Sequence, residues 1–147
     1  MSKHRFEKLF SADEANQLIP RLEAIIRDLQ VQAGAIRKRI ADLARFDDKL
    51  ADLDLPKVIT RYPELRPIAT RMSELAGEIQ EMGCFLKDID QGLVDFPFVI
   101  DTEDDDEEDV AFLCWQYGEP RIVAWHSVEG GFGQRRPLPG VDKPLLN

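Results

Sequence analysis

The stretch IPRLEAIIRDLQVQAGAIRKRIADL, residues 19–43, decides the fold of this chain. Its apolar side chains recur at alternating spacings of three and four residues, at Ile19, Leu22, Ile26, Leu29, Ala33, Ile36, Ile40 and Leu43. This heptad pattern predicts a long helix with one apolar stripe that packs against a second helix. Ser11 and Glu14 have the spacing of a capping box, so we predict that the helix spans residues 11–50. Pro20 predicts a kink or a restart within it.

A second heptad stripe follows a break in the helical pattern. The break, residues 51–66, contains two residue–proline steps, and Pro67 suits the first turn of a new helix over residues 67–92. The apolar stripe of that helix comprises Ile68, Met72, Leu75, Ile79, Met82, Leu86, Ile89 and Leu93. Gly92 has the position of a C-terminal capping glycine. Two matching stripes joined by one loop indicate an antiparallel helical hairpin.

Small residues form an additional stripe on the second predicted helix. Ala69, Ala76 and Gly83 recur every seven residues and would allow another element to approach closely. That element is either the chain's own β module or N-terminal segment, or a second copy of the chain. In the second case the two hairpins form a four-helix bundle, and the protein is a homo-oligomer, most simply a dimer.

The period changes after Gly92, and residues 93–138 are predicted to form a small β module. Val94–Ile100, interrupted by Pro97, is typical of an edge strand. Better strand patterns cover Val110–Trp115 and Ile122–His126, with Gly118 in the turn between them. With an extended tail over residues 139–147, the chain is predicted to be one α+β domain, residues 1–147, whose small antiparallel sheet packs at one end of the hairpin.

The net charge of −9 arises mostly from one segment, residues 101–109, in which Thr102 is the only residue that is not acidic. Outside it, the remaining 20 acidic residues nearly balance 19 basic ones. A block of like charges is typical of a solvated loop, and the alternative is a site for a cation or a basic partner. The segment has no glycine, which is unlike a calcium-binding loop.

His126 and two aspartates are the first candidates for chemistry. Asp88 and Asp95 flank the predicted turn at Gly92, and a β hairpin folded over that turn would bring His126 to one or both of them. One histidine and two carboxylates could hold a divalent metal or perform general acid–base catalysis. The alternative is a structural network in which Lys87, Arg121 or Arg135 neutralises the carboxylates.

The cysteines and tryptophans favour core packing. Cys84 and Cys114 lie in apolar surroundings and are predicted to be buried, reduced thiols, although Cys114 and His126 could form a cross-strand pair. We expect Trp115 and Trp125 to face each other across the hairpin, as packing or as an aromatic floor for a ligand. The full candidate junction site is Lys87, Asp88, Asp95, Trp115, Trp125, His126 and Arg135.

Several uncommon motifs occur together in the C-terminal half. They are the block from Gly83 to Pro97, Leu113-Cys114-Trp115, Gly118-Glu119-Pro120, Trp125-His126, and Gly131-Phe132 up to Arg136-Pro137-Leu138. Together with the opening Phe10 to Leu22, they resemble the uncharacterised bacterial family called domain of unknown function 2203. Gln134 departs from this pattern, which tends to have glycine there. The resemblance implies a bacterial, cytoplasmic protein and no particular activity.

Two functions are consistent with these features. The first is a non-enzymatic scaffold that self-associates through its hairpin and binds an unidentified protein partner, without a cofactor. The second is a small-molecule or metal-binding protein, with or without enzymatic activity, whose site lies at the helix–sheet junction. The sequence has no net basic face and no run of about 18 apolar residues, so we expect neither nucleic-acid nor membrane binding. It lacks a signal-peptide pattern, which also predicts a cytoplasmic location.

Overall fold

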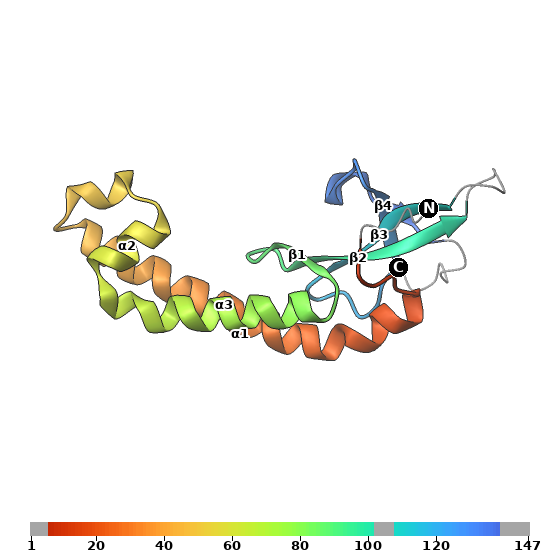
Figure 1. Ribbon diagram of the computed structural model, residues 1–147, viewed down its shortest axis with the longest axis horizontal. Coiled ribbons are helices and arrows are strands. Elements are labelled where there is room, and N and C mark those ends of the chain that lie inside the picture. Colours follow the sequence, from red (N-terminus) through yellow and green to blue (C-terminus); the bar gives the residue numbers. More distant parts are fainter. Residues whose placement is uncertain (1–5, 102–107, 139–147) are drawn as a thin grey trace.

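A computed structural model of the chain describes residues 6–101 and 108–138 and has an α+β fold. Helices α1 (Ala12–Ala44) and α3 (Arg66–Glu81) lie side by side, and a five-stranded sheet covers one end of the pair (Figure 1). Ion pairs Arg21–Glu78 and Asp28–Arg71 join the helices in opposite sequence order, so the two run antiparallel. The predicted combination of helical hairpin and terminal sheet is therefore confirmed.

Helix α1 begins as predicted and continues through its proline. The Glu14 amide donates to Ser11 Oγ at 3.1 Å, and the Ser11 amide donates to Glu14 Oε1 at 2.9 Å, which completes the capping box. The predicted restart at Pro20 is wrong, because α1 is continuous over 33 residues. Ile19 and Leu22 are buried on either side of Pro20. Packing of this face outweighs the roughly 3 kcal/mol cost of an interior proline.

The far end of the hairpin is more ordered than the sequence suggested. Helix α1 ends at Ala44 instead of residue 50, because Asp47 caps a separate 3-10 turn, η1 (Asp48–Asp52). The predicted connecting segment, residues 51–66, contains helix α2 (Leu55–Arg61) and a second 3-10 turn, η2 (Pro63–Leu65). Asp54 caps α2, and Pro56 lies in its first turn, where a missing amide costs little. A small core closes this end, formed by Ile36, Leu50, Val58 and Leu65.

The second helix is shorter than the predicted range of residues 67–92. It ends at Glu81, and Gly83 follows with φ of +93°, a conformation that terminates a helix and favours glycine. The chain then forms strand β1 (Phe85–Asp88), so Gly92, with φ of +68°, lies in a strand-to-strand turn and caps no helix. Leu86 and Ile89 contact the same core as the helix residues, which explains why they match a helical pattern.

The sheet is an antiparallel meander in the order β1-β2-β3-β4-β5. Its other strands are β2 (Leu93–Asp101), β3 (Glu108–Gln116), β4 (Ala124–Ser127) and β5 (Arg136–Pro137). The sheet therefore begins before the predicted module of residues 93–138. Strand β2 is not an edge strand throughout, because β1 pairs with its first three residues; beyond them, the Phe10 amide donates to the Pro97 carbonyl at 2.7 Å.

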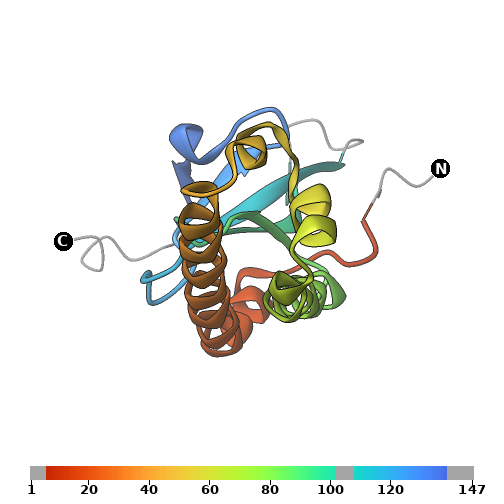
Figure 2. The ribbon, with the colours of Figure 1, turned by 90° about the vertical axis from the view of Figure 1, so that its left-hand side faces the viewer.

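One face of the sheet packs on the helices. Alternate residues of β2 and β3, among them Val94, Phe96, Leu113 and Trp115, are fully buried with α1 and α3 residues in the main core. Viewed along the hairpin, the sheet spans both helices (Figure 2). The intervening residues of the same strands lie on the other face. Of the predicted acidic loop, residues 102–107 lie outside the described residues, as does the tail, residues 139–147.

Candidate functional site

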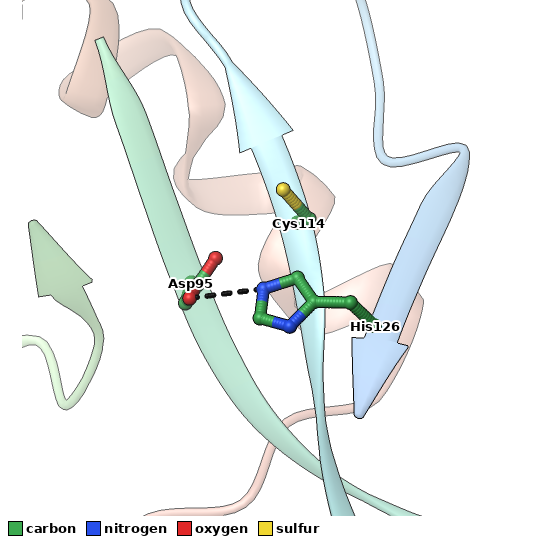
Figure 3. A group of neighbouring side chains, drawn as sticks. All are labelled: Asp95, Cys114 and His126. Carbon is green, nitrogen blue, oxygen red and sulfur yellow. Dashed lines mark hydrogen bonds and ion pairs between the residues drawn. The ribbon is translucent and has the colours of Figure 1, made fainter. Parts of the chain in front are cut away.

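The face of the sheet that points away from the helices carries a buried polar cluster. Asp95 in β2 lies directly opposite Cys114 in β3, and His126 in β4 lies opposite Phe112, one diagonal step from Cys114. Ligand-type atoms of Asp95, Cys114 and His126 all lie within 4.8 Å of one another (Figure 3). The side chains come from three adjacent strands, so the pairing register itself creates the cluster.

All three side chains are removed from solvent. Asp95 is 4% exposed, His126 is 3% exposed and Cys114 is 1% exposed. Burial raises the pKa of the Cys114 thiol to about 12, and the negative charge of Asp95 contributes in the same direction. Without a bound cation, Cys114 is therefore a neutral thiol at physiological pH and a poor nucleophile.

The histidine is oriented by a backbone group. Its Nδ1 lies 2.8 Å from the Ser127 carbonyl oxygen, which can only accept, so Nδ1 carries a hydrogen. Nε2 lies 3.1 Å from Asp95 Oδ2. In a neutral ring with hydrogen on Nδ1, Nε2 presents a lone pair to the carboxylate. The contact is favourable only when a proton or a metal cation lies between these two atoms.

No lysine or arginine of the described residues forms an ion pair with the buried carboxylate of Asp95. Over residues 6–101 and 108–138, the only ion-pair partner of Asp95 is His126. The hypothesis that Lys87, Arg121 or Arg135 neutralises Asp95 is therefore wrong for the described residues. A buried carboxylate without a fixed cation is costly, which makes the cluster a site of interest rather than ordinary core packing.

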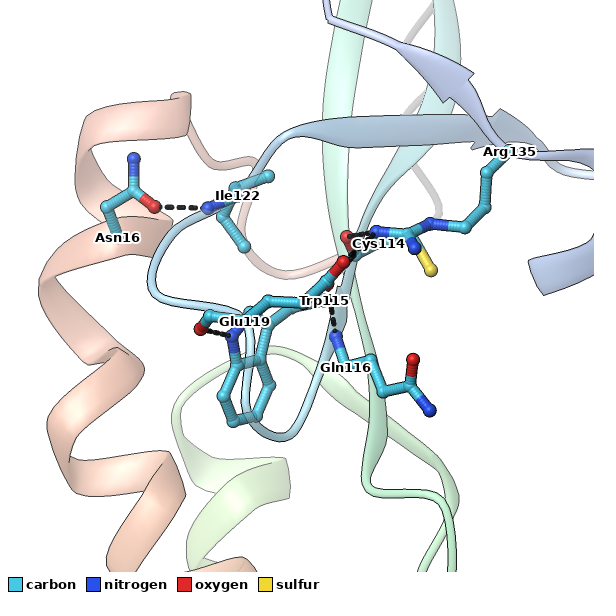
Figure 4. A network of polar contacts seen from close by, with 7 residues as sticks. All are labelled: Asn16, Cys114, Trp115, Gln116, Glu119, Ile122 and Arg135. Atoms are coloured by element: carbon cyan, nitrogen blue, oxygen red, sulfur yellow. Dashed lines mark hydrogen bonds and ion pairs between the residues drawn. The ribbon is translucent and has the colours of Figure 1, made fainter. Parts of the chain in front are cut away.

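Arg135 holds the backbone next to the cluster. Its Nη2 donates to both carboxylate oxygens of Glu119, at 3.0 and 2.9 Å, and to the Cys114 carbonyl at 3.2 Å. Glu119 also accepts from the Gln116 amide through Oε1, while its carbonyl accepts from Trp115 Nε1 (Figure 4). These bonds fix the turn after β3 and thereby the position of Cys114.

The same turn is attached to the helical hairpin. Asn16 on α1 accepts from the Ile122 amide at 2.6 Å, so the start of the long helix holds the segment that leads into β4 (Figure 4). Gly118 in this turn has φ of +102°, as the predicted hairpin requires. The β3–β4 register that places His126 beside Cys114 is thus held from both sides.

A small cavity adjoins the cluster. Its volume is about 90 Å³, and Asp95, Cys114 and His126 all line it. Lys87 from β1 lies at its border, while Phe112 and Phe132 form apolar walls. Of the predicted site residues, Lys87, Asp95 and His126 are therefore together.

Arg135 contacts the backbone of Cys114, and the other predicted site residues lie elsewhere. Asp88 does not join the cluster, because its carboxylate accepts from the Gln91 amide at 2.9 Å within the β1–β2 turn. Trp115 lies in the main core on the helix-facing side, and Trp125 lies opposite Leu113 and packs edge-to-face on Phe98. The expectation that the tryptophans face each other is wrong. Cys114, predicted to be a core thiol, is the third member of the cluster in place of Asp88.

A second, wider groove of about 500 Å³ lies between the helical hairpin and the β1–β2 turn. Its floor includes Ile36 and Met72, and Arg37 pairs with Asp90 across it at 3.1 Å. Lys87 borders this groove as well as the small cavity. The groove contains no comparable buried cluster among the described residues.

The residues of the predicted small-residue stripe have different surroundings. Ala69 contacts the core at the far end of the hairpin, and Ala76 is half-buried on α3. Gly83 lies beyond the helix, where an added Cβ would meet Lys8 at 3.0 Å and Phe10 at 3.5 Å. The chain's own N-terminal segment thus covers Gly83, and an oligomer interface at these positions stays a prediction.

Fold and site together define a small α+β protein with a buried Asp–Cys–His cluster on the outer face of its sheet. Residues 8–138 match the family model described as Uncharacterized conserved protein (DUF2203), and the chain belongs to this family. No curated protein and no solved structure matches the chain. Within the described residues, every helix is too short or too polar to cross a membrane.

Proposed function

We propose that this protein binds one divalent transition metal ion, with zinc as the best fit, through Asp95, Cys114 and His126. The observation that carries the proposal is the convergence of three ligand-type atoms within 4.8 Å at a buried point. Zinc is bound by carboxylate oxygen, thiolate sulfur and imidazole nitrogen at about 2.0–2.3 Å, which places its ligand atoms roughly 3.3–3.7 Å apart. Small side-chain adjustments of Cys114 would satisfy this spacing.

The orientation of His126 supports the same proposal. Metal-bound histidines usually donate their second ring nitrogen to a carbonyl or carboxylate, which aims the other nitrogen at the metal. The Ser127 carbonyl has this role here, and Nε2 points to Asp95. A cation at this point also compensates the buried carboxylate. Binding would remove the proton from Cys114, since a coordinated thiol is deprotonated.

The ligand set favours zinc over magnesium or calcium. Hard cations prefer six or more oxygen ligands, and this cluster offers one carboxylate. A thiolate with an imidazole is typical of zinc, and the same set accepts cobalt(II) as a spectroscopic substitute. Three protein ligands with a tetrahedral metal leave one position for a further ligand, which is the arrangement of catalytic rather than purely structural zinc sites.

A competition titration tests the proposal. Apo protein is titrated with zinc against a chromogenic chelator, and we expect one site per chain in the wild type. Cys114→Ala should weaken zinc affinity by about 100-fold or more, because loss of even an outer partner of a metal ligand costs about 10–100-fold. Cys84→Ala is the matched control, because Cys84 is equally buried but donates to the Ile79 carbonyl in the helix-side core. Equal affinities in both variants would refute the site.

We further propose that the protein resides in the bacterial cytoplasm. Cys84 and Cys114 are both free and buried, and a reducing compartment preserves such thiols. Cell fractionation of a bacterium that expresses the chain, with zinc-loaded protein recovered from the soluble interior, is the expected result.

Self-association through the helical hairpin is a second proposal. The observation that favours it is exposed apolar surface: Val31 on α1 is 62% exposed and Phe46, just beyond that helix, is 89% exposed. Light scattering after size-exclusion chromatography should report a dimer in the wild type and a monomer for Val31→Glu. A monomeric wild type at high concentration would refute it, independently of metal binding.

A further inference from the structure

We propose that the bound metal keeps an open coordination position that takes a small anion from the adjoining cavity. This inference rests on the proposed metal site and specifies its ligand. The three protein ligands come from one side, since Asp95, Cys114 and His126 all project from the outer face of the sheet. A tetrahedral ion held by them therefore presents its fourth position away from the sheet, where the cavity lies.

The size of the cavity limits the ligand. Its volume of about 90 Å³ is well below the roughly 300–1,000 Å³ of pockets that hold drug-sized ligands. A ligand of three or four non-hydrogen atoms fits this space, whereas a nucleotide or a sugar does not. Phe112 and Phe132 restrict the cavity with apolar walls, so the ligand must form its polar contacts with the metal and with the remaining border.

The charges favour an anion. A divalent ion bound to one carboxylate, one thiolate and a neutral imidazole has a local charge of zero, and a zinc centre of this kind still attracts an anionic fourth ligand as a Lewis acid. Lys87 is the one cationic side chain among the residues that border the cavity. It is exposed and forms no ion pair within the described part of the chain, so its ammonium group can face an anion near the metal.

The inferred ligand class is thus a small monoanion, such as a short carboxylate, bicarbonate or a metal-bound hydroxide. Larger anions that merely contact Lys87 from outside would not reach the metal. Lys87 also borders the wider groove. None of the three metal-binding side chains lines that groove, so an anion bound there would not reach the metal.

Cobalt-loaded protein with azide as the probe tests this inference. Cobalt bound through Cys114 should produce a thiolate-to-metal charge-transfer absorption, and saturating azide should shift the visible cobalt bands with one ligand per metal. Lys87→Ala should retain cobalt and weaken azide binding by about two- to fivefold, the range expected for an exposed charge. Val128→Phe, at the border of the cavity, should retain cobalt and weaken azide binding further by narrowing the space.

The outcomes separate the two proposals. Protein that shows the charge-transfer band, but whose visible cobalt bands azide leaves unchanged, would have a closed coordination sphere; this result would overturn the inference, while the metal site itself would stand. Absence of the band would refute the metal site and this inference together. Azide binding that is equal in wild type and Val128→Phe would show that the anion does not enter the cavity, which also overturns the inference.

Discussion

Two buried aspartates, one at each end of the molecule, are held in different ways. At the far end of the hairpin, Asp47 accepts from Arg61 Nε, from the Tyr62 hydroxyl at 2.6 Å and from the Lys49 amide at 3.1 Å. In the sheet, Asp95 faces His126 and Cys114. Asp47 thus has a permanent cation and several donors, whereas Asp95 has two groups that bind metals and no permanent cation.

The difference separates a buried carboxylate with a structural role from one that can bind a cation. Arg61, together with the Tyr62 hydroxyl, lowers the pKa of Asp47 from 3.8 to about 2, which is typical of a satisfied structural network. The carboxylate in such a network is already paired and hydrogen-bonded, so it requires no bound proton or metal ion. Asp95 is more buried, at 4% exposed against 8% for Asp47, and lacks this compensation, so a proton or a metal ion must supply it.

The largest expected effect concerns zinc affinity. Asp95→Asn should reduce zinc affinity by about 100-fold or more, equivalent to about 2.7 kcal/mol, because a neutral amide replaces a charged ligand. Asp47→Asn should leave zinc affinity unchanged. Isothermal titration of both variants measures this contrast, and a large loss in Asp47→Asn would show that the two ends are coupled.

The second effect is stabilisation of the folded protein by zinc. At free zinc 100 times the dissociation constant, the free energy of unfolding should rise by about 2.7 kcal/mol, which corresponds to roughly 8 °C in melting temperature. Asp47→Asn should show the same zinc-induced shift as the wild type, whereas Cys114→Ala, with about 100-fold weaker affinity, should gain only about 0.4 kcal/mol or less at the same zinc concentration. Thermal unfolding followed by circular dichroism, with and without a chelator, provides the measurement.

The third effect is a smaller change in the free energy of unfolding of the metal-free protein, with opposite signs for substitutions of the two aspartates. In metal-free protein, Asp95→Asn should maintain or raise the free energy of unfolding, by up to about 1 kcal/mol, because the new amide can donate to Nε2 of His126. Asp47→Asn should lower it, because Arg61 and Tyr62 lose their charged acceptor. Denaturant unfolding of both apo variants tests the contrast, and a large loss of stability in apo Asp95→Asn would mean that Asp95 is structural.

The fourth effect is the acid dependence of stability. The pKa of Asp47 is lower in the folded chain than its ordinary value of 3.8, so its stabilising contribution is present above that value. This contribution should be lost as the pH falls from 3.8 to about 2. Urea unfolding across this range should show a steeper decline for the wild type than for Asp47→Asn. Parallel curves would contradict the assignment of the low pKa to Asp47.

The sequence predicted the hairpin because heptad spacing reports helix packing directly. It did not predict the end of α3, since Leu86 and Ile89 remain at helical spacing while they contact the same core from a strand and its turn. The positive φ of Gly83 is the physical reason for the earlier end. Capping by Asp47 and Asp54 sets where η1 and α2 begin, and these short polar side chains lie outside the heptad pattern.

Part of the site was also predictable. Asp95 and His126 meet as predicted, but the third member of the cluster is Cys114 and not the predicted Asp88. Sequence distance from the turn suggested Asp88, whereas cross-strand register decides which residues are neighbours. A register that pairs Asp95 with Cys114 would have identified the cluster, and the structure shows that β2 and β3 keep this register without a shift from Leu93–Gln116 to Asp101–Glu108.

Native mass spectrometry of protein purified without an affinity tag or chelator tests the metal site most directly. After incubation with equimolar zinc, wild type and Asp47→Asn should each carry one zinc ion per chain, and Asp95→Asn should have the apo mass. An apo mass for the wild type, or a zinc adduct of equal abundance on Asp95→Asn, would contradict a metal site at Asp95, Cys114 and His126.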